Sequence, residues 1–128
     1  MKTILVDAVN TFIIKGQGIN VEMQKLLDAY PNPKIILTNA DDEQIVQFGL
    51  QNLPYPLFTL KHAPDKVDPA YFRTMLEHFH LTPDDVVYFE HNQQTFESAQ
   101  SVGITSYHYD AEKKDLKSLQ VFLDSRLK

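Results

Sequence analysis

The sequence predicts an α/β protein, a three-layer α/β/α Rossmann-like arrangement, and the evidence is the alternation of two kinds of segment. Short runs rich in β-branched and aromatic residues are typical of strands, and they span residues 3–7, 34–38, 56–60, 86–89 and 105–109. Between them apolar residues recur at helical spacing, as at Val21, Met23, Leu26, Leu27 and Tyr30. This alternation predicts βαβ units and a five-stranded parallel sheet.

The ends of the predicted helices are marked by capping residues. Asp68 before Pro69 gives an N-cap followed by proline at the first helical position. Asp41 and Asp42 place negative charge at another helix start, before a pattern that runs as far as Leu50. The last helix is expected to use Leu116, Leu119, Phe122 and Leu123. These signals divide the chain into the helices that the predicted sheet requires.

The composition is that of an ordinary globular protein and excludes several classes. With 128 residues, 43% hydrophobic and 23% charged, we expect one domain spanning residues 1–128. A formal charge of -5 with scattered basic residues argues against nucleic acid as a partner. There is no cysteine and no apolar stretch of membrane-spanning length, so we expect no disulfide, no membrane partner and a cytoplasmic location.

The most informative segment is the first predicted strand, which ends in the carboxylate of Asp7. Open parallel sheets build their sites at the carboxyl ends of strands, so Asp7 is the first candidate for chemistry. A hydroxyl residue, Thr11, follows four positions later. A phosphate-transferring aspartate usually has a second carboxylate two residues on, and here that position is Val9. The predicted site therefore looks incomplete.

Four segments in the same order resemble the motifs of the haloacid dehalogenase-like (HAD) superfamily. Its Asp-x-Asp-x-Thr motif is matched by Asp7-Ala8-Val9-Asn10-Thr11, and its strand ending in Ser or Thr by Ile35-Ile36-Leu37-Thr38-Asn39. Its Lys before a helix is matched at residues 66–72, and its acidic loop and small-residue helix at residues 86–103. The resemblance covers nearly the whole chain. It is based on the order of the four motifs, the spacing between them and their positions at the ends of predicted strands.

The resemblance implies a HAD fold with the strands in the order 5-4-1-2-3 and no cap domain. The family inserts caps in two places, within the hairpin after Thr11 or before Lys66. Residues 11–20 have room only for the hairpin that Gly16 and Gly18 predict, and residues 38–66 are filled by one helix and one strand. The chain thus resembles a minimal, capless (C0-type) member with degenerate motifs.

The resemblance also assigns chemical roles. Asp7 would attack a phosphoryl group and pass through an aspartyl-phosphate intermediate. Thr38 and Asn39 would bind the phosphate oxygens, and Lys66 would neutralise charge on the aspartate and the phosphate. The catalytic candidates are therefore Asp7, Thr38 and Lys66, and the phosphate-binding candidates are Thr38, Asn39 and Lys66.

Two further family roles fall on unsuitable side chains. The general acid/base aspartate falls on Val9, and the main metal-binding aspartate falls on His91. Asp7, Glu90 and His91 are the candidate metal ligands, but Mg²⁺ prefers oxygen ligands and imidazole suits Mn, Ni or Zn better. We therefore expect either weak Mg²⁺ binding or another divalent metal.

Each candidate also has a structural interpretation. Thr38 and Asn39 could form only a strand end and helix cap, and residues 90–92 only a polar loop that caps the next helix. Lys61 competes with Lys66, which is preferred because Asp68 fixes the start of the following helix. The site assignment thus depends on where the fold places these residues.

Three function classes follow. The first is a HAD-like phosphatase, weak or specialised, and the balance of the residues favours an enzyme. The second is a pseudoenzyme that binds without turnover, which the substitutions at Val9 and His91 support. A response-regulator receiver domain fits worse, because the third predicted strand does not end in an acceptor aspartate. The expected partners are a phosphorylated small molecule or macromolecule, or a protein that covers the open site.

Overall fold

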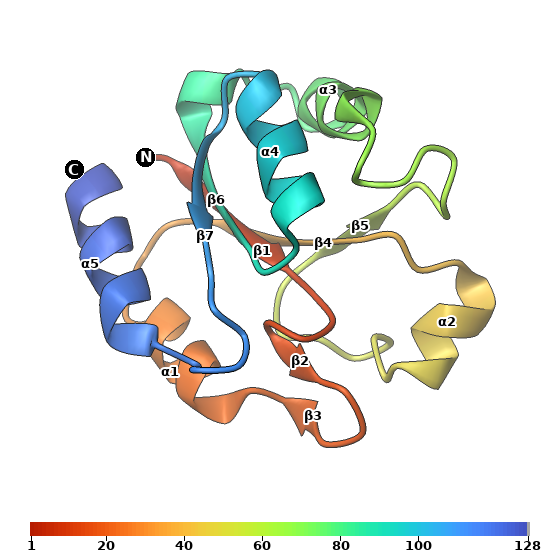
Figure 1. Cartoon of the computed structure of the whole chain (residues 1–128), viewed down its shortest axis with the longest axis horizontal. Helices are drawn as coiled ribbons and strands as arrows, with labels where there is room; N and C mark the ends of the chain where they lie inside the picture. Colours follow the sequence, from red (N-terminus) through yellow and green to blue (C-terminus); the bar gives the residue numbers. More distant parts are fainter. Residues whose placement is uncertain (128) are drawn as a thin grey trace.

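A five-stranded parallel sheet forms the centre of the computed structural model, which describes residues 1–127. Its strands are β1 (Thr3–Asp7), β4 (Lys34–Thr38), β5 (Leu57–Thr59), β6 (Val86–Glu90) and β7 (Thr105–His108). They lie side by side in the order β5-β4-β1-β6-β7 (Figure 1). Counted without the two hairpin strands and read from the other edge, this is the order 5-4-1-2-3. The predicted fold class is confirmed.

Helices cover both faces of the sheet. They are α1 (Val21–Asp28), α2 (Asp42–Gln47), α3 (Pro69–His78), α4 (Gln93–Ser101) and α5 (Leu116–Arg126), with a short 3-10 helix at Pro83–Asp85. Figure 1 shows α3 and α4 together on one face, and α1 and α5 on the other. No helix within residues 1–127 is long and apolar enough to cross a membrane.

The core is divided by the sheet into two buried clusters. Val6 and Phe89 pack with residues of α1 and α5, whereas Leu5 and Tyr88 pack with residues of α3 and α4. Successive residues of a strand point to opposite faces, so each central strand supplies both clusters. The central strands β1 and β6 are therefore apolar along almost their whole length, and their carboxyl ends are held rigidly.

The predicted helix caps are present. Asp68 caps α3 by accepting a hydrogen bond from the backbone N–H of Ala70, with Pro69 at the first helical position. Asp41 caps α2 and forms a capping box with Gln44. These caps fix where each helix begins relative to the strand before it.

Strands β5 and β7 are each shorter than predicted, and two further elements also differ in length. The helical pattern predicted toward Leu50 is wrong at its end, because α2 stops at Gln47 and Gly49 adopts a left-handed φ of 72°. Strand β6 runs one residue further than predicted, because Glu90 continues the pairing with β7 opposite His108. That extra residue places the Glu90 carboxylate at the end of a strand instead of in a loop.

The predicted hairpin after β1 is present as β2 (Ile13–Ile14) and β3 (Gly18–Ile19). Gly16 and Gly18 take left-handed φ values of 81° and 97°, which glycine adopts without strain. The chain between β4 and α3 contains only α2 and β5 as regular elements. Both segments border the edge of the sheet where Asp7 lies.

Candidate active site

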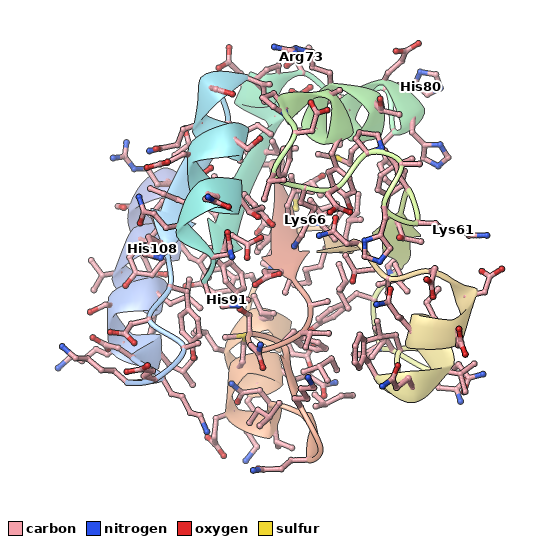
Figure 2. All side chains as sticks on the ribbon, turned by 45° about the vertical axis from the view of Figure 1, so that its right-hand side comes forward. Lys61, Lys66, Arg73, His80, His91 and His108 are labelled. Carbon is pink, nitrogen blue, oxygen red and sulfur yellow. The ribbon has the colours of Figure 1, made fainter. Side chains whose placement is uncertain are left out.

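Three neighbouring strands end in polar side chains at one edge of the sheet. Asp7, Thr38 and Glu90 are the last residues of β1, β4 and β6, and β1 lies between the other two. His91 follows Glu90 directly, and Lys66 reaches the same place from the loop before α3. Figure 2 shows Lys66 and His91 close to the end of β1. The structure thus brings together the residues that the sequence singled out.

Lys66 is the centre of the cluster. Its side chain is 6% exposed, and its ammonium nitrogen lies 2.7 Å from Asp7 Oδ1 and 2.9 Å from Glu90 Oε1. The Leu37 carbonyl and the Tyr88 hydroxyl each lie 3.3 Å away. A buried ammonium needs such partners, because an unpaired charge in the interior costs several kcal/mol.

The loop that carries Lys66 is anchored by Asn39. The side-chain Oδ1 of Asn39 accepts a hydrogen bond of 2.7 Å from the backbone N–H of Lys66. Asp68, two residues later, caps α3. Asn39 therefore positions Lys66 in addition to lining the site, a role that the phosphate-binding prediction did not include.

The second oxygen of Asp7 has its own partners. Asp7 Oδ2 accepts a hydrogen bond of 2.6 Å from the Thr11 hydroxyl and lies 2.5 Å from His91 Nδ1. An ionised carboxylate only accepts hydrogen bonds, so Nδ1 carries the proton in this contact. The His91 side chain is 26% exposed, whereas that of Asp7 is 4% exposed. His91 therefore covers part of the buried carboxylate.

The electrostatics of the cluster keep Asp7 ionised. Burial would raise the pKa of Asp7, but the charge of Lys66 and the hydrogen bond from His91 hold it well below its usual range. At Glu90, burial and the neighbouring charge of Asp7 raise the pKa to about 7. Burial would lower the pKa of Lys66, but both carboxylates outweigh that effect and raise it. At neutral pH the negative charge of the cluster therefore lies mainly on Asp7, and Glu90 is partly protonated.

A cavity of about 250 Å³ opens onto this cluster. Asp7, Thr38, Lys66 and His91 all line it. The Thr38 hydroxyl oxygen accepts a hydrogen bond of 3.2 Å from the backbone N–H of Ala40, so its own proton can be donated to a ligand. The cavity is large enough for a phosphoryl group beside Asp7.

Sequence reasoning missed the Tyr88 hydroxyl, which donates a hydrogen bond to Glu90 Oε1. Strand alternation carried a signal for it, because residues 88 and 90 of one strand face the same side. His62, Gln44 and Phe48 also line the cavity. Nothing in the sequence marks His62, because it lies in a loop with a left-handed φ of 66°.

Lys61, the competing lysine, lies away from the cluster. Its ammonium pairs with Asp42 at 3.0 Å, and its side chain is 55% exposed. Figure 2 shows Lys61 pointing outward, with Arg73 and His80 also at the periphery. The preference for Lys66 over Lys61 is thus supported by position.

Comparison with known proteins identifies the fold. No protein-family model and no curated protein matches the sequence. A HAD-family enzyme from Bacteroides thetaiotaomicron, in complex with magnesium and inorganic phosphate, has a TM-score of 0.72 at 12% identity, over 93% of this chain and 98% of that chain. The chain has a HAD-like fold.

Two further solved structures share this HAD-like fold. A haloacid dehalogenase-like protein of unknown function from Agrobacterium tumefaciens is 17% identical, with a TM-score of 0.61 over 86% of this chain and 62% of that chain. The cobalt-bound deoxy-D-mannose-octulosonate 8-phosphate phosphatase from Haemophilus influenzae is 13% identical, with a TM-score of 0.54 over 100% of this chain and 90% of that chain.

Two of these HAD-like structures hold a divalent metal, but the donor set of this chain fits Mg²⁺ poorly. Ligand atoms of Asp7, Glu90 and His91 do lie within 4.8 Å of one another. All four carboxylate oxygens, however, already accept hydrogen bonds, Glu90 Oε2 from the Asn92 backbone and the others from side chains. The Lys66 ammonium lies between the two carboxylates, where a cation would bind. A metal that prefers imidazole could use His91 Nδ1 with Asp7 Oδ2 and Glu90 Oε2, which lie 2.5 and 3.4 Å from it, but it would have to replace the Nδ1 proton and the hydrogen bonds from Thr11 and Asn92.

The titration of Glu90 leads to a stability prediction. The pKa of Glu90 is raised from 4.5 to about 7, so between these values the folded chain binds more protons than the unfolded chain. The contribution of Glu90 to the free energy of unfolding therefore falls as pH rises from about 4.5 to 7, by at most about 3 kcal/mol. Glu90→Gln should remove this decline, and urea unfolding across pH 4.5 to 8 measures it.

Glu97→Gln is the matched control, because Glu97 is an exposed carboxylate on α4. Its unfolding curve should keep the pH dependence of the wild type. Parallel wild-type and Glu90→Gln curves across the whole range would show that Glu90 is ionised in the folded chain from low pH.

Proposed function

We propose that this chain is a capless HAD-like phosphohydrolase in which Asp7 attacks the phosphorus of a phosphate ester. The observation that carries the proposal is a buried carboxylate, held ionised by Lys66 and His91, that faces a cavity of about 250 Å³. A carboxylate nucleophile must be unprotonated and correctly placed. In this proposal the described residues form one domain, and its fold positions Asp7.

The proposed reaction has two steps. Asp7 attacks phosphorus, a P–O bond to Asp7 forms, and the bond to the leaving group breaks with its electron pair. Water then attacks the aspartyl phosphate, the P–O bond to Asp7 breaks, and the protons of the water leave with inorganic phosphate. Lys66 and the Thr38 hydroxyl stabilise the charge on the non-bridging phosphoryl oxygens. No step passes through a metal ion, because the residues present do not fit Mg²⁺.

The leaving group must depart without help from the residue two positions after Asp7. Val9 lines the cavity there and cannot transfer a proton. A positioned general acid/base contributes about 10²–10⁴-fold, so esters that need protonation should be poor substrates. Aryl and acyl phosphates leave unprotonated and should be favoured. The proposed activity is thus selective for substrates whose leaving group departs without a proton.

A specific observation favours a second function, a pseudoenzyme that binds a phosphorylated ligand or a protein partner. Both oxygens of Asp7 are occupied by Lys66, Thr11 and His91, so the cluster is satisfied without a substrate. Such a cluster could keep the surface around Asp7 in one fixed shape for binding a ligand, without Asp7 acting as a nucleophile. The site, which is also bordered by Gln44 of α2, His62 of the loop after β5 and Thr95 of α4, would admit a protein or another macromolecule.

A leaving-group screen tests the proposal. Wild type and Asp7→Asn are assayed on aryl, acyl and alkyl phosphates with Mg²⁺, Mn²⁺, Zn²⁺ or EDTA. We expect aryl and acyl phosphates to be hydrolysed in EDTA, alkyl phosphates to lag far behind, and Asp7→Asn to lose the activity. Mg²⁺-dependent turnover of an alkyl phosphate would contradict the proposal. Phosphate binding without any turnover would establish the second function instead.

A further inference from the structure

A second cavity, of about 410 Å³, adjoins the candidate active site. Val9 and Phe48 line both cavities, so the two spaces meet at these side chains. The second cavity lies between the β2–β3 hairpin and the end of α2, which occupy the lower right of Figure 1. A phosphate ester bound at Asp7 would extend its leaving group past Val9 into this space. We call it the leaving-group cavity.

The walls of the leaving-group cavity are mostly apolar or bare backbone. Val9, Ile13 and Phe48 supply the apolar side chains. The hairpin contributes Gly16 and Gly18, where an added Cβ would meet nothing within 4 Å. Small-molecule sites are typically about 300–1,000 Å³ and lined by apolar and aromatic groups. The cavity is therefore suited to a flat apolar group such as an aromatic ring.

One charged side chain, Lys15, lines this cavity. Its ammonium nitrogen lies 5.7 Å from the centroid of the Phe48 ring. Within residues 1–127, Lys15 forms no ion pair with an acidic side chain. None of the residues that line the cavity is acidic. The ammonium of Lys15, which is exposed, is therefore not neutralised by an acidic side chain at this cavity.

We propose that the leaving-group cavity selects aryl phosphates that carry a carboxylate on the ring, which is the substrate class of the proposed phosphohydrolase. The inference rests on that proposed function. The ring packs between Val9 and Phe48, and its carboxylate faces Lys15. When Asp7 attacks phosphorus, the P–O bond breaks and its electron pair leaves with the phenolate, which solvent protonates. Val9 thus serves as an apolar wall where a proton donor would otherwise stand.

The test compares matched substrates and matched lysine variants. Phenyl phosphate and 4-carboxyphenyl phosphate are assayed with wild type, Lys15→Met and Lys117→Met, the last an exposed lysine on α5. Binding of benzylphosphonate and 4-carboxybenzylphosphonate, which cannot be hydrolysed, is measured by calorimetry. We expect a lower KM for the carboxylated substrate with wild type. Lys15→Met should raise the KM of the carboxylated substrate about fivefold relative to the KM of phenyl phosphate, because an exposed ion pair contributes up to about 1 kcal/mol.

The outcomes separate this inference from the proposed function. Turnover of both substrates with equal KM, unchanged by Lys15→Met, would overturn the inference and leave the hydrolase standing. Suppose that neither substrate is turned over, but that the carboxylated phosphonate binds more tightly and Lys15→Met abolishes this difference. That result would overturn the proposed hydrolase and support carboxylated aryl phosphates as the ligand class. Absence of both turnover and selective binding would overturn both. An equal effect of Lys117→Met would show a general charge effect and would also overturn the inference.

Discussion

Lys66→Met is expected to lower the free energy of unfolding by about 3–5 kcal/mol at pH 7, because it leaves buried carboxylates without their counter-charge. Lys66 lies within 2.9 Å of both Asp7 and Glu90, and all three side chains are almost fully buried. Methionine fills a similar volume but cannot donate a hydrogen bond. Urea unfolding at pH 7 measures the change. Protonation of the carboxylates should relieve it, so the loss should be smaller at pH 4.

Lys61→Met is the matched control, because Lys61 lies five residues earlier in an exposed ion pair with Asp42. Exposed pairs contribute about 0–1 kcal/mol, so this variant should be nearly as stable as the wild type. Equal losses for the two variants would show that Lys66 does not neutralise buried charge. Any residual aryl phosphatase activity of Lys66→Met should also be lower, because the phosphoryl oxygens lose their cation.

The sequence predicts the fold and most of the site because the end of each strand can be recognised from the residues around it. Apolar runs define the strands, and parallel pairing brings the carboxyl ends of those strands to one edge, so Asp7 and Thr38 could be placed together from the chain alone. Lys66 could be selected over Lys61 because the Asp68 cap fixes the start of α3.

The partners of these residues could not be predicted in the same way. The sequence indicates Glu90 as a candidate metal ligand, whereas in the structure it pairs with Lys66 and Tyr88. That pairing depends on β6 extending by one residue, which no sequence pattern indicates. His62 enters the cavity through a left-handed loop. The adjoining leaving-group cavity depends on the distance between a hairpin and a helix, which is a tertiary property.

Val9→Asp is expected to raise the turnover of alkyl phosphates by about 10²–10⁴-fold, the usual contribution of a positioned general acid. Val9 lines both the active-site cavity and the leaving-group cavity, so a carboxyl group there lies beside the departing oxygen. Aryl phosphates should gain little, because a phenolate leaves without a proton. Their KM should rise, since a polar group replaces part of the apolar wall. Steady-state kinetics on matched alkyl and aryl phosphates measure both effects.

Val9→Asn separates proton transfer from a change of shape. Asparagine is nearly isosteric with aspartate but cannot transfer a proton at the pH of the assay, so this variant should share the weaker aryl binding and show no gain on alkyl phosphates. An equal gain in both variants would mean that polarity or space at position 9 limits the wild type. An equal gain on alkyl and aryl substrates in Val9→Asp would mean that loss of the leaving group is not the difficult step. Selective rescue of alkyl phosphates by aspartate alone would show that the missing proton donor makes the wild type selective for its leaving group.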